Sequence, residues 1–252
     1  MTLHFKVNPY YLLAHSLERT WSNKPFPEWA RLVKKMQVTS QFLFKNSARA
    51  FIEINDEKEL NQAFQATQKI FFTILKAPEF KKLLQEAERY RAWVENEWRK
   101  KGEFTLHILK DITGLTFPHF TLTVLITHPE LSNGSNIPEE KIICWGHSED
   151  WKNYTIVYLC HEILHILTHK KFINEEVMHA IIELATDNEL RIQINQKGQY
   201  FKEGRYEVGH VRLRNLEKRM LPLWKKYLRG NLKAKSIVSF EKLVTERKPI
   251  EN

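Results

Sequence analysis

Apolar residues recur at three- and four-residue steps over much of the first hundred residues, as in Ile70, Phe71, Ile74 and Leu75. This spacing places them on one face of a helix and predicts a helical layer. Glycine is scarce, with 8 among 252 residues, which suits a mainly helical protein with few tight turns. We expect four helices here, over Tyr10 to Thr20, after Pro27, from about Glu57 to Leu75 and from about Glu79 to Lys101.

The pattern changes past Gly102, where β-branched and aromatic residues cluster. A domain boundary is therefore expected near this residue, although one continuous domain fits the pattern equally well. It would separate a helical N-terminal region, 1–103, from a second unit, 104–252. Strands are predicted over Phe104 to Leu109, over Phe120 to Ile126 and, after a loop that covers 128–140, over Lys141 to Trp145.

Helical spacing returns after Asp150 and predicts one helix to Lys170 and another from Asn174 to about Asn195. The second begins at a good N-cap residue and continues with two glutamates, which suit the positive end of the helix dipole. Segment 196–210 holds three of the glycines and is expected to be a long loop, often a functional feature. A basic amphipathic helix should follow, with Pro222 kinking or dividing it.

Composition is that of a folded chain, with 42% hydrophobic and 27% charged residues. No run approaches the ~20 apolar residues of a membrane-spanning helix. The first residues lack the pattern of a secretory signal. Only Cys144 and Cys160 are present, so no disulfide framework is expected. A cytoplasmic location is the resulting expectation.

Charge is distributed unevenly. Segment 197–252 contains 15 Lys and Arg against 6 Asp and Glu, an excess of +9, whereas the preceding 196 residues balance at 24 against 24. Such a basic region could bind nucleic acid, an anionic membrane surface or an acidic protein. Its simplest interpretation is a solvated helix face.

The segment His161-Glu162-Ile163-Leu164-His165 carries the first candidate chemistry. On a helix, the two histidines lie one turn apart on the same face, where both imidazoles can bind one Zn²⁺ ion. Glu162 lies beside that face, within reach of a water molecule at the ion. The flanking residues are apolar on nearly every side, which predicts a buried helix whose polar groups need partners. A catalytic zinc site still needs a third protein ligand.

The next predicted helix offers that ligand. It places Glu183 and Asp187 one turn apart among apolar residues. Glu183 is the expected third ligand. Asp187 could accept the free ring N–H of a liganding histidine and fix its tautomer.

Together, the two motifs resemble those of the gluzincin metallopeptidases, over about Lys141 to Leu190. The resemblance implies His161, His165 and Glu183 as zinc ligands, Glu162 as general base and Asp187 as the residue that orients a ligand. It also implies an α+β fold, mainly helical, in which a small sheet packs against the HExxH helix and the Glu-bearing helix. By the same analogy, the strand before the motif is the edge strand that holds substrate, with Trp145, Gly146 and His147 lining the cleft.

Alternative third ligands are His169 and His179. His169 lies a further turn along the same predicted helix, where three histidines could hardly surround one ion. His179 gives a spacing similar to that of the SprT-type DNA-associated proteases, although Ala180 stands where they have glycine. A zinc-binding or interaction protein without turnover is a further alternative.

The implied reaction is peptide-bond hydrolysis by a zinc-activated water, with Glu162 passing the proton to the leaving amine of a peptide or protein substrate. The oxyanion needs a second stabilising group, usually a Tyr or His outside the ligand set. Segment 196–210 supplies the candidates, His210 first, then Tyr206, then Tyr200.

Overall fold

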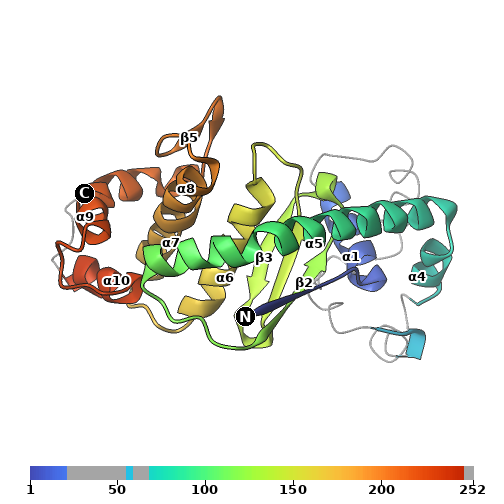
Figure 1. Ribbon diagram of the computed structural model, residues 1–252. Coiled ribbons are helices and arrows are strands. Elements are labelled where there is room, and N and C mark those ends of the chain that lie inside the picture. The colour runs from blue at the N-terminus through green and yellow to red at the C-terminus, as the bar shows by residue number, and fades with distance from the viewer. Residues whose placement is uncertain (22–54, 59–67, 247–252) are drawn as a thin grey trace.

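The computed structural model describes residues 1–21, 55–58 and 68–246. It is a mainly helical α+β protein with a small mixed sheet, as predicted. The long helix α5 (Pro78–Thr113) crosses one face of the sheet, with α1 (Pro9–Trp21) near its N-terminal end and the C-terminal helices near the other (Figure 1). Helix α4 (Gln68–Leu75) matches the end of the predicted helix 57–75, while the helix expected after Pro27 lies outside the described residues.

The main sheet has the strand order β1-β2-β4-β3. Its first three strands are parallel and β3 is antiparallel to β4, so β3 forms an edge. Strand β1 was not predicted from the sequence, although the alternation of Leu3 and Phe5 with polar residues is a strand pattern. The strands are β1 (Thr2–Lys6), β2 (Thr121–Ile126), β3 (Asn133–Ile137) and β4 (Ile142–Gly146).

The predicted strand Phe104 to Leu109 is wrong, because α5 continues through this segment to Thr113. The buried residues Thr105, Leu109 and Ile112 follow a helical spacing and face the core. Packing of this face therefore overrides the local β-propensity. Gly102, where a boundary was expected, lies inside the helix, and the Trp98 ring occupies the space that a Cβ would need.

The edge of the sheet is also not where the sequence placed it. Strand β4, expected to be the edge, lies between β2 and β3. The true edge strand comes from the segment expected to be a loop. Its sequence, Asn-Gly-Ser-Asn-Ile, has weak β-propensity, and its pairing with β4 holds it extended.

Two consecutive helices follow the sheet, α6 (Tyr154–Thr168) and α7 (Glu175–Glu183). The predicted N-cap is confirmed, because the Asn174 side chain accepts a hydrogen bond from the Val177 amide at 3.1 Å. A π-helical turn, η4 (Leu184–Leu190), continues α7 into α8 (Arg191–Asn195). The sheet packs on α6, and α6, α7 and η4 share one apolar core with it.

Segment 196–210 is a loop that contains a short hairpin, β5 (Lys202–Glu203) and β6 (Tyr206–Glu207), which projects from the body (Figure 1). A 3₁₀ turn, η5 (Val211–Leu213), leads into the predicted basic helix α9 (Arg214–Leu228). Pro222 lies exposed within α9 and does not divide it. Helix α10 (Ile237–Glu246) completes the fold and was not predicted.

Both cysteines are buried and free, consistent with the absence of a disulfide framework. Among the described helices, none combines the length and apolarity needed to cross a membrane.

Candidate metal centre

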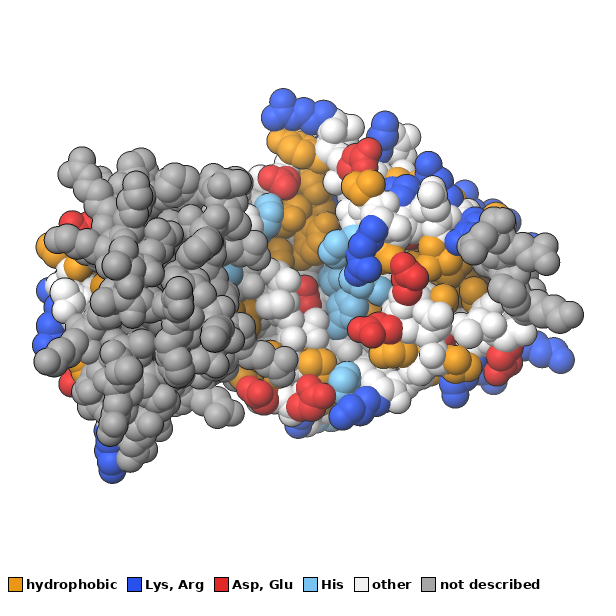
Figure 2. Space-filling model, turned by 180° about the vertical axis from the view of Figure 1, so that it is seen from behind, with side chains coloured by type: hydrophobic (Ala, Val, Ile, Leu, Met, Phe, Trp, Pro, Cys, Tyr) orange, Lys and Arg blue, Asp and Glu red, His pale blue; other side chains and the backbone are white. Residues whose placement is uncertain are grey.

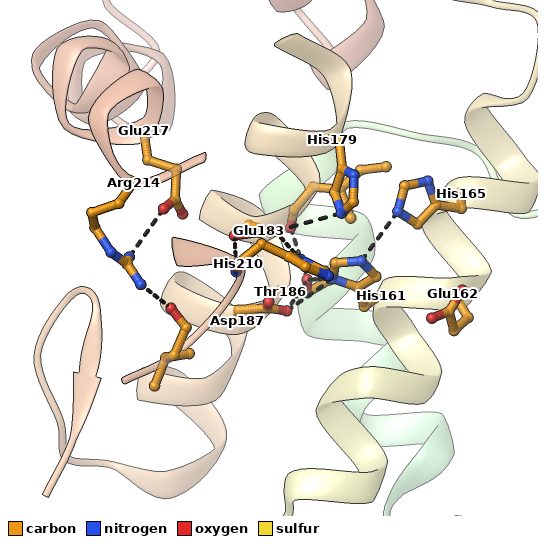
Figure 3. Close-up of polar contacts among 12 residues, drawn as sticks. His161, Glu162, His165, His179, Glu183, Thr186, Asp187, His210, Arg214 and Glu217 are labelled. Carbon is orange, nitrogen blue, oxygen red and sulfur yellow. Dashed lines mark hydrogen bonds and ion pairs between the residues drawn. The ribbon is translucent and has the colours of Figure 1, made fainter. Parts of the chain in front are cut away.

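The two histidines of the HExxH segment lie on one face of α6 with their Nε2 atoms turned toward each other (Figure 3). The two atoms, on His161 and His165, are 3.1 Å apart. Both side chains lie largely inside the protein, because the helix is apolar on its other sides. Two ring nitrogens can share one proton, or their lone pairs can bind one cation.

The imidazole of His179, on α7, completes a group of three. Candidate ligand atoms of His161, His165 and His179 all lie within 4.8 Å of one another. The ring centroid of His179 is 4.6 Å from that of His165 and 5.4 Å from that of His161. Because α6 and α7 are joined by the short segment 169–174, residues at similar distances from the turn face each other, as His165 and His179 do.

Glu183, the expected third ligand, lies one turn further along α7 and belongs to a second group, with His179 and His210. Its carboxylate is fully buried. One oxygen lies 2.5 Å from Nδ1 of His210 and 3.5 Å from Nε2 of His179, and the other accepts the His210 amide at 2.9 Å. Both oxygens of Glu183 thus bind His210, and Glu183 lies beside the three-histidine group.

Asp187 lies where the sequence predicted an orienting residue. Its Oδ1 is 3.0 Å from Nδ1 of His161 and also accepts a hydrogen bond from the Thr186 hydroxyl at 2.8 Å. A proton on Nδ1 of His161 leaves the Nε2 lone pair directed at the group of three.

The three imidazoles differ in the direction of their pKa shifts. Burial lowers the pKa of His165 to about 2 and that of His179 to about 3, and the neighbouring imidazoles act in the same direction. Burial also disfavours the charged form of His161, but the charge and hydrogen bond of Asp187 outweigh it and raise its pKa to about 9. Two neutral rings therefore face one ring that must release a proton before its Nε2 can bind a cation.

Glu162 lies beside the two histidines of its helix (Figure 3) and is buried. Burial raises the pKa of its carboxyl group. Its Oε2 accepts a hydrogen bond of 2.5 Å from the side-chain amide of Asn136, on the edge strand β3. Gly134 faces the same carboxylate, since a Cβ there would lie 3.8 Å from Oε1. The edge strand and Glu162 thus form one wall of the site.

An aromatic face extends from the histidines along the first turns of α6. The ring of Tyr158 lies 5.8 Å from that of His161, and Tyr154 follows at 4.5 Å. Figure 2 shows a strip of hydrophobic side chains beside the clustered histidines. The sequence reasoning missed these tyrosines, although the steps 154, 158, 161 and 165 place all four residues on one helix face.

The three residues expected to line the cleft have different environments. Trp145 is buried, and its indole N–H donates to the Tyr90 hydroxyl at 3.0 Å. Gly146 is buried too, and a Cβ there would overlap the Thr127 hydroxyl. His147 is partly exposed and stacks on Tyr154 at 4.7 Å. Trp145 stacks on Tyr158 at 6.0 Å from inside the protein, and His147 extends the aromatic face at the surface.

The π-helical turn fixes the loop that carries His210. The side chain of Asn188 donates to the Glu183 carbonyl at 3.0 Å and to Glu217 at 3.3 Å, and it accepts the Phe201 amide at 2.6 Å. The buried guanidinium of Arg191 donates to the Asp187 carbonyl at 2.7 Å. It also binds two loop residues, through the Glu203 carboxylate and the Gln199 carbonyl.

The remaining predicted candidates lie elsewhere. Tyr206 is in the hairpin, where its hydroxyl accepts a hydrogen bond from Arg205 at 3.1 Å. The Tyr200 hydroxyl donates to Glu189. His169 lies at the C-terminal end of α6, 3.0 Å from Glu139. Of the loop candidates, His210 is the one whose ring reaches the cluster, 4.9 Å from that of His179.

The donor set fits zinc. Three imidazoles converge, two with lowered pKa values, and Nε2 of His179 is buried without a hydrogen-bond partner. Borderline-soft nitrogen donors with an adjacent carboxylate are the ligands of catalytic zinc sites.

Comparisons of the chain with protein-family models, curated proteins and solved structures found no match.

Proposed function

We propose that the protein is a zinc-dependent metallopeptidase in which His161, His165 and His179 hold the ion. The observation that carries this proposal is the convergence of the three imidazoles, with ligand atoms within 4.8 Å of one another, beside the buried Glu162. His179 replaces Glu183 in the ligand set that the resemblance implied, because Glu183 is bound to His210.

Each residue has a distinct task in this proposal. Bound zinc would polarise a scissile carbonyl and make a nearby water molecule more acidic. Glu162 takes a proton from water and delivers it to the leaving amine, a role suited to a buried carboxylate whose pKa is raised. His210 stabilises negative charge on the substrate oxygen, since its ring lies next to that of His179 and its Nδ1 is held by Glu183.

A peptide is the substrate class that suits the surroundings. The outer edge of β3, which no described strand pairs with, offers backbone groups to an extended chain. The side chain of Asn136 on this strand contacts Glu162. The hydrophobic strip beside the histidines (Figure 2) can receive an apolar side chain next to the scissile bond.

The test combines zinc content with peptide hydrolysis. Purified wild-type protein should contain one zinc per chain, and His161→Ala and His179→Ala should contain almost none. Glu162→Gln should retain zinc and lose roughly 100- to 10,000-fold in the rate of cleavage of a mixed peptide library. His169→Ala is the matched control, because it removes a histidine at the end of the same helix and should change neither quantity.

Two outcomes would contradict parts of the proposal. Stoichiometric zinc in His179→Ala together with its loss in Glu183→Gln would restore Glu183 as third ligand. Bound zinc without cleavage, and with Glu162→Gln indistinguishable from wild type, would indicate a zinc protein without peptidase activity.

A further inference from the structure

The solvent face of α9 has an unusual charge pattern. Its buried residues, including Glu217, Met220, Trp224 and Tyr227, recur at three- and four-residue steps and face the core. The opposite face carries two pairs of basic side chains, which the turn 220–224 separates. The exposed ones are Lys218, Arg219, Lys225, Lys226 and, directly after the helix, Arg229.

Acidic residues do not balance the charge of this face, because carboxylates in this part of the chain are buried and bound within the protein. Glu217 is buried and paired with Arg214 at 3.0 Å. Glu241 is buried and accepts the amides of Ile173 and Asn174 at the start of α7. Within the described segment 197–246, 12 of the 13 Lys and Arg residues are exposed, whereas only Glu207 and Glu246 are exposed acids. The surface is thus more basic than the sequence count indicates.

Basic side chains also lie beside the candidate metal centre. Exposed Arg212 lies two residues after His210, in the turn that opens α9, and α9 packs on α7. Lys202 and Arg205 add exposed charge on the projecting hairpin. Figure 2 shows one Lys or Arg side chain against the histidines and further ones toward the upper right of the view.

We infer that the solvent face of α9, from Arg212 to Arg229, is a docking surface for the phosphate backbone of nucleic acid. The paired cations at 218–219 and 225–226 are seven residues apart, about 10.5 Å along the helix, or about three base-pair steps. No exposed acid interrupts the α9 face, and its exposed residues include no large apolar side chain of the kind that anchors a protein partner. Evenly spaced cations without groups for specific recognition suit a polyanion whose charges are also evenly spaced.

This inference is independent of the proposed peptidase activity, and binding tests it directly. Fluorescence anisotropy would measure the affinity of the full chain for a labelled duplex of about 30 base pairs over a series of salt concentrations. The variant combines Lys218→Gln, Lys225→Gln, Lys226→Gln and Arg229→Gln. The matched control combines Lys81→Gln, Lys82→Gln, Arg89→Gln and Arg99→Gln, which are exposed on α5. Both lower the formal charge equally, from +9 to +5 (9 − 4).

The α9 variant should bind at least about tenfold more weakly than wild type. Its slope of log affinity against log salt should be smaller by about 3 to 4, since each phosphate contact contributes about 0.9. The control should stay within about twofold of wild type. An equal loss in both variants would overturn the inference, as would undetectable binding by wild type. It would also be overturned if polyglutamate or phosphatidylserine vesicles competed as well as DNA at equal charge.

Discussion

Oδ1 of Asp187 lies 3.0 Å from Nδ1 of His161, and this contact joins the π-helical turn to the HExxH helix. It decides which nitrogen of His161 faces the other two imidazoles. A carboxylate in this position makes the opposite nitrogen a stronger donor to a cation.

Asp187→Asn should therefore weaken zinc binding about 10- to 100-fold, because the amide holds the ring without its negative charge. Competition with a fluorescent chelator would measure the affinity. The matched control is Glu189→Gln, which removes a carboxylate from the same turn, where it contacts Gln193 and Tyr200 and not a histidine of the cluster. An unchanged affinity in Asp187→Asn would show that the contact does not tune the ligand.

Zinc should stabilise the fold, because the three histidines lie on two separate helices. An ion at 100 times its dissociation constant adds about 2.7 kcal/mol to the free energy of unfolding. For a chain of this size, this raises Tm by roughly 5 to 11 °C. Differential scanning fluorimetry with zinc and with a chelator would measure it. The shift should vanish in His179→Ala and persist in His169→Ala.

Gly209→Ala should disrupt the loop that carries His210. Gly209 has φ +78°, and an added Cβ would overlap Oε2 of the buried Glu183. Gly204→Ala is the control, since its φ is also positive, +59°, but the space around it is open. We expect the control to lose only about 1 kcal/mol, from backbone strain, and Gly209→Ala to lose clearly more. Equal Tm values for the two variants would contradict the close approach of the loop to Glu183.

Glu217 should make stability depend on pH. Burial, followed by the charge of Glu183, raises its pKa to about 8, against an ordinary value near 4.5. The folded state therefore binds a proton that the unfolded state has released, so the stabilising contribution is complete below about pH 4.5 and is lost as pH rises through about 8. Between pH 6 and 9, Tm of wild type should fall by several degrees more than Tm of Glu217→Gln, whose amide stays neutral. Parallel Tm profiles would contradict the raised pKa.

Sequence periodicity predicted the helices around the candidate site well, because their apolar faces are buried as periodicity requires. It failed at Phe104 to Leu109, where β-branched residues lie in α5. Strands β1 and β3 were also not predicted. The alternation in β1 is short and was not recognised, whereas the polar and glycine residues of β3 carry no strand pattern, and pairing with β4 holds it extended.

The candidate site was predictable in part. The i, i+4 spacing of His161 and His165 and the buried acids of the next helix were visible in the sequence. His179, Glu183 and Asp187 follow one another at four-residue steps, so spacing alone could not show which of them meets His165. That depends on the crossing of two helices. The hydrogen bond from Asn136 to Glu162 depends on an edge strand that the sequence did not reveal.

The π-helical turn Leu184–Leu190 has a consequence for how this protein can change. A π turn is an α-helix that holds one residue more than its regular repeat. Deleting one residue from it would restore the regular α-helix, because the extra residue is accommodated within the turn and the helix beyond it keeps its orientation. The residues inside the turn, Asp187 and Asn188 among them, would then shift relative to His161 and to the loop that carries His210. Substitutions within the turn should therefore be tolerated more easily than a change in its length. Related chains that keep the same site should also keep a turn of the same length.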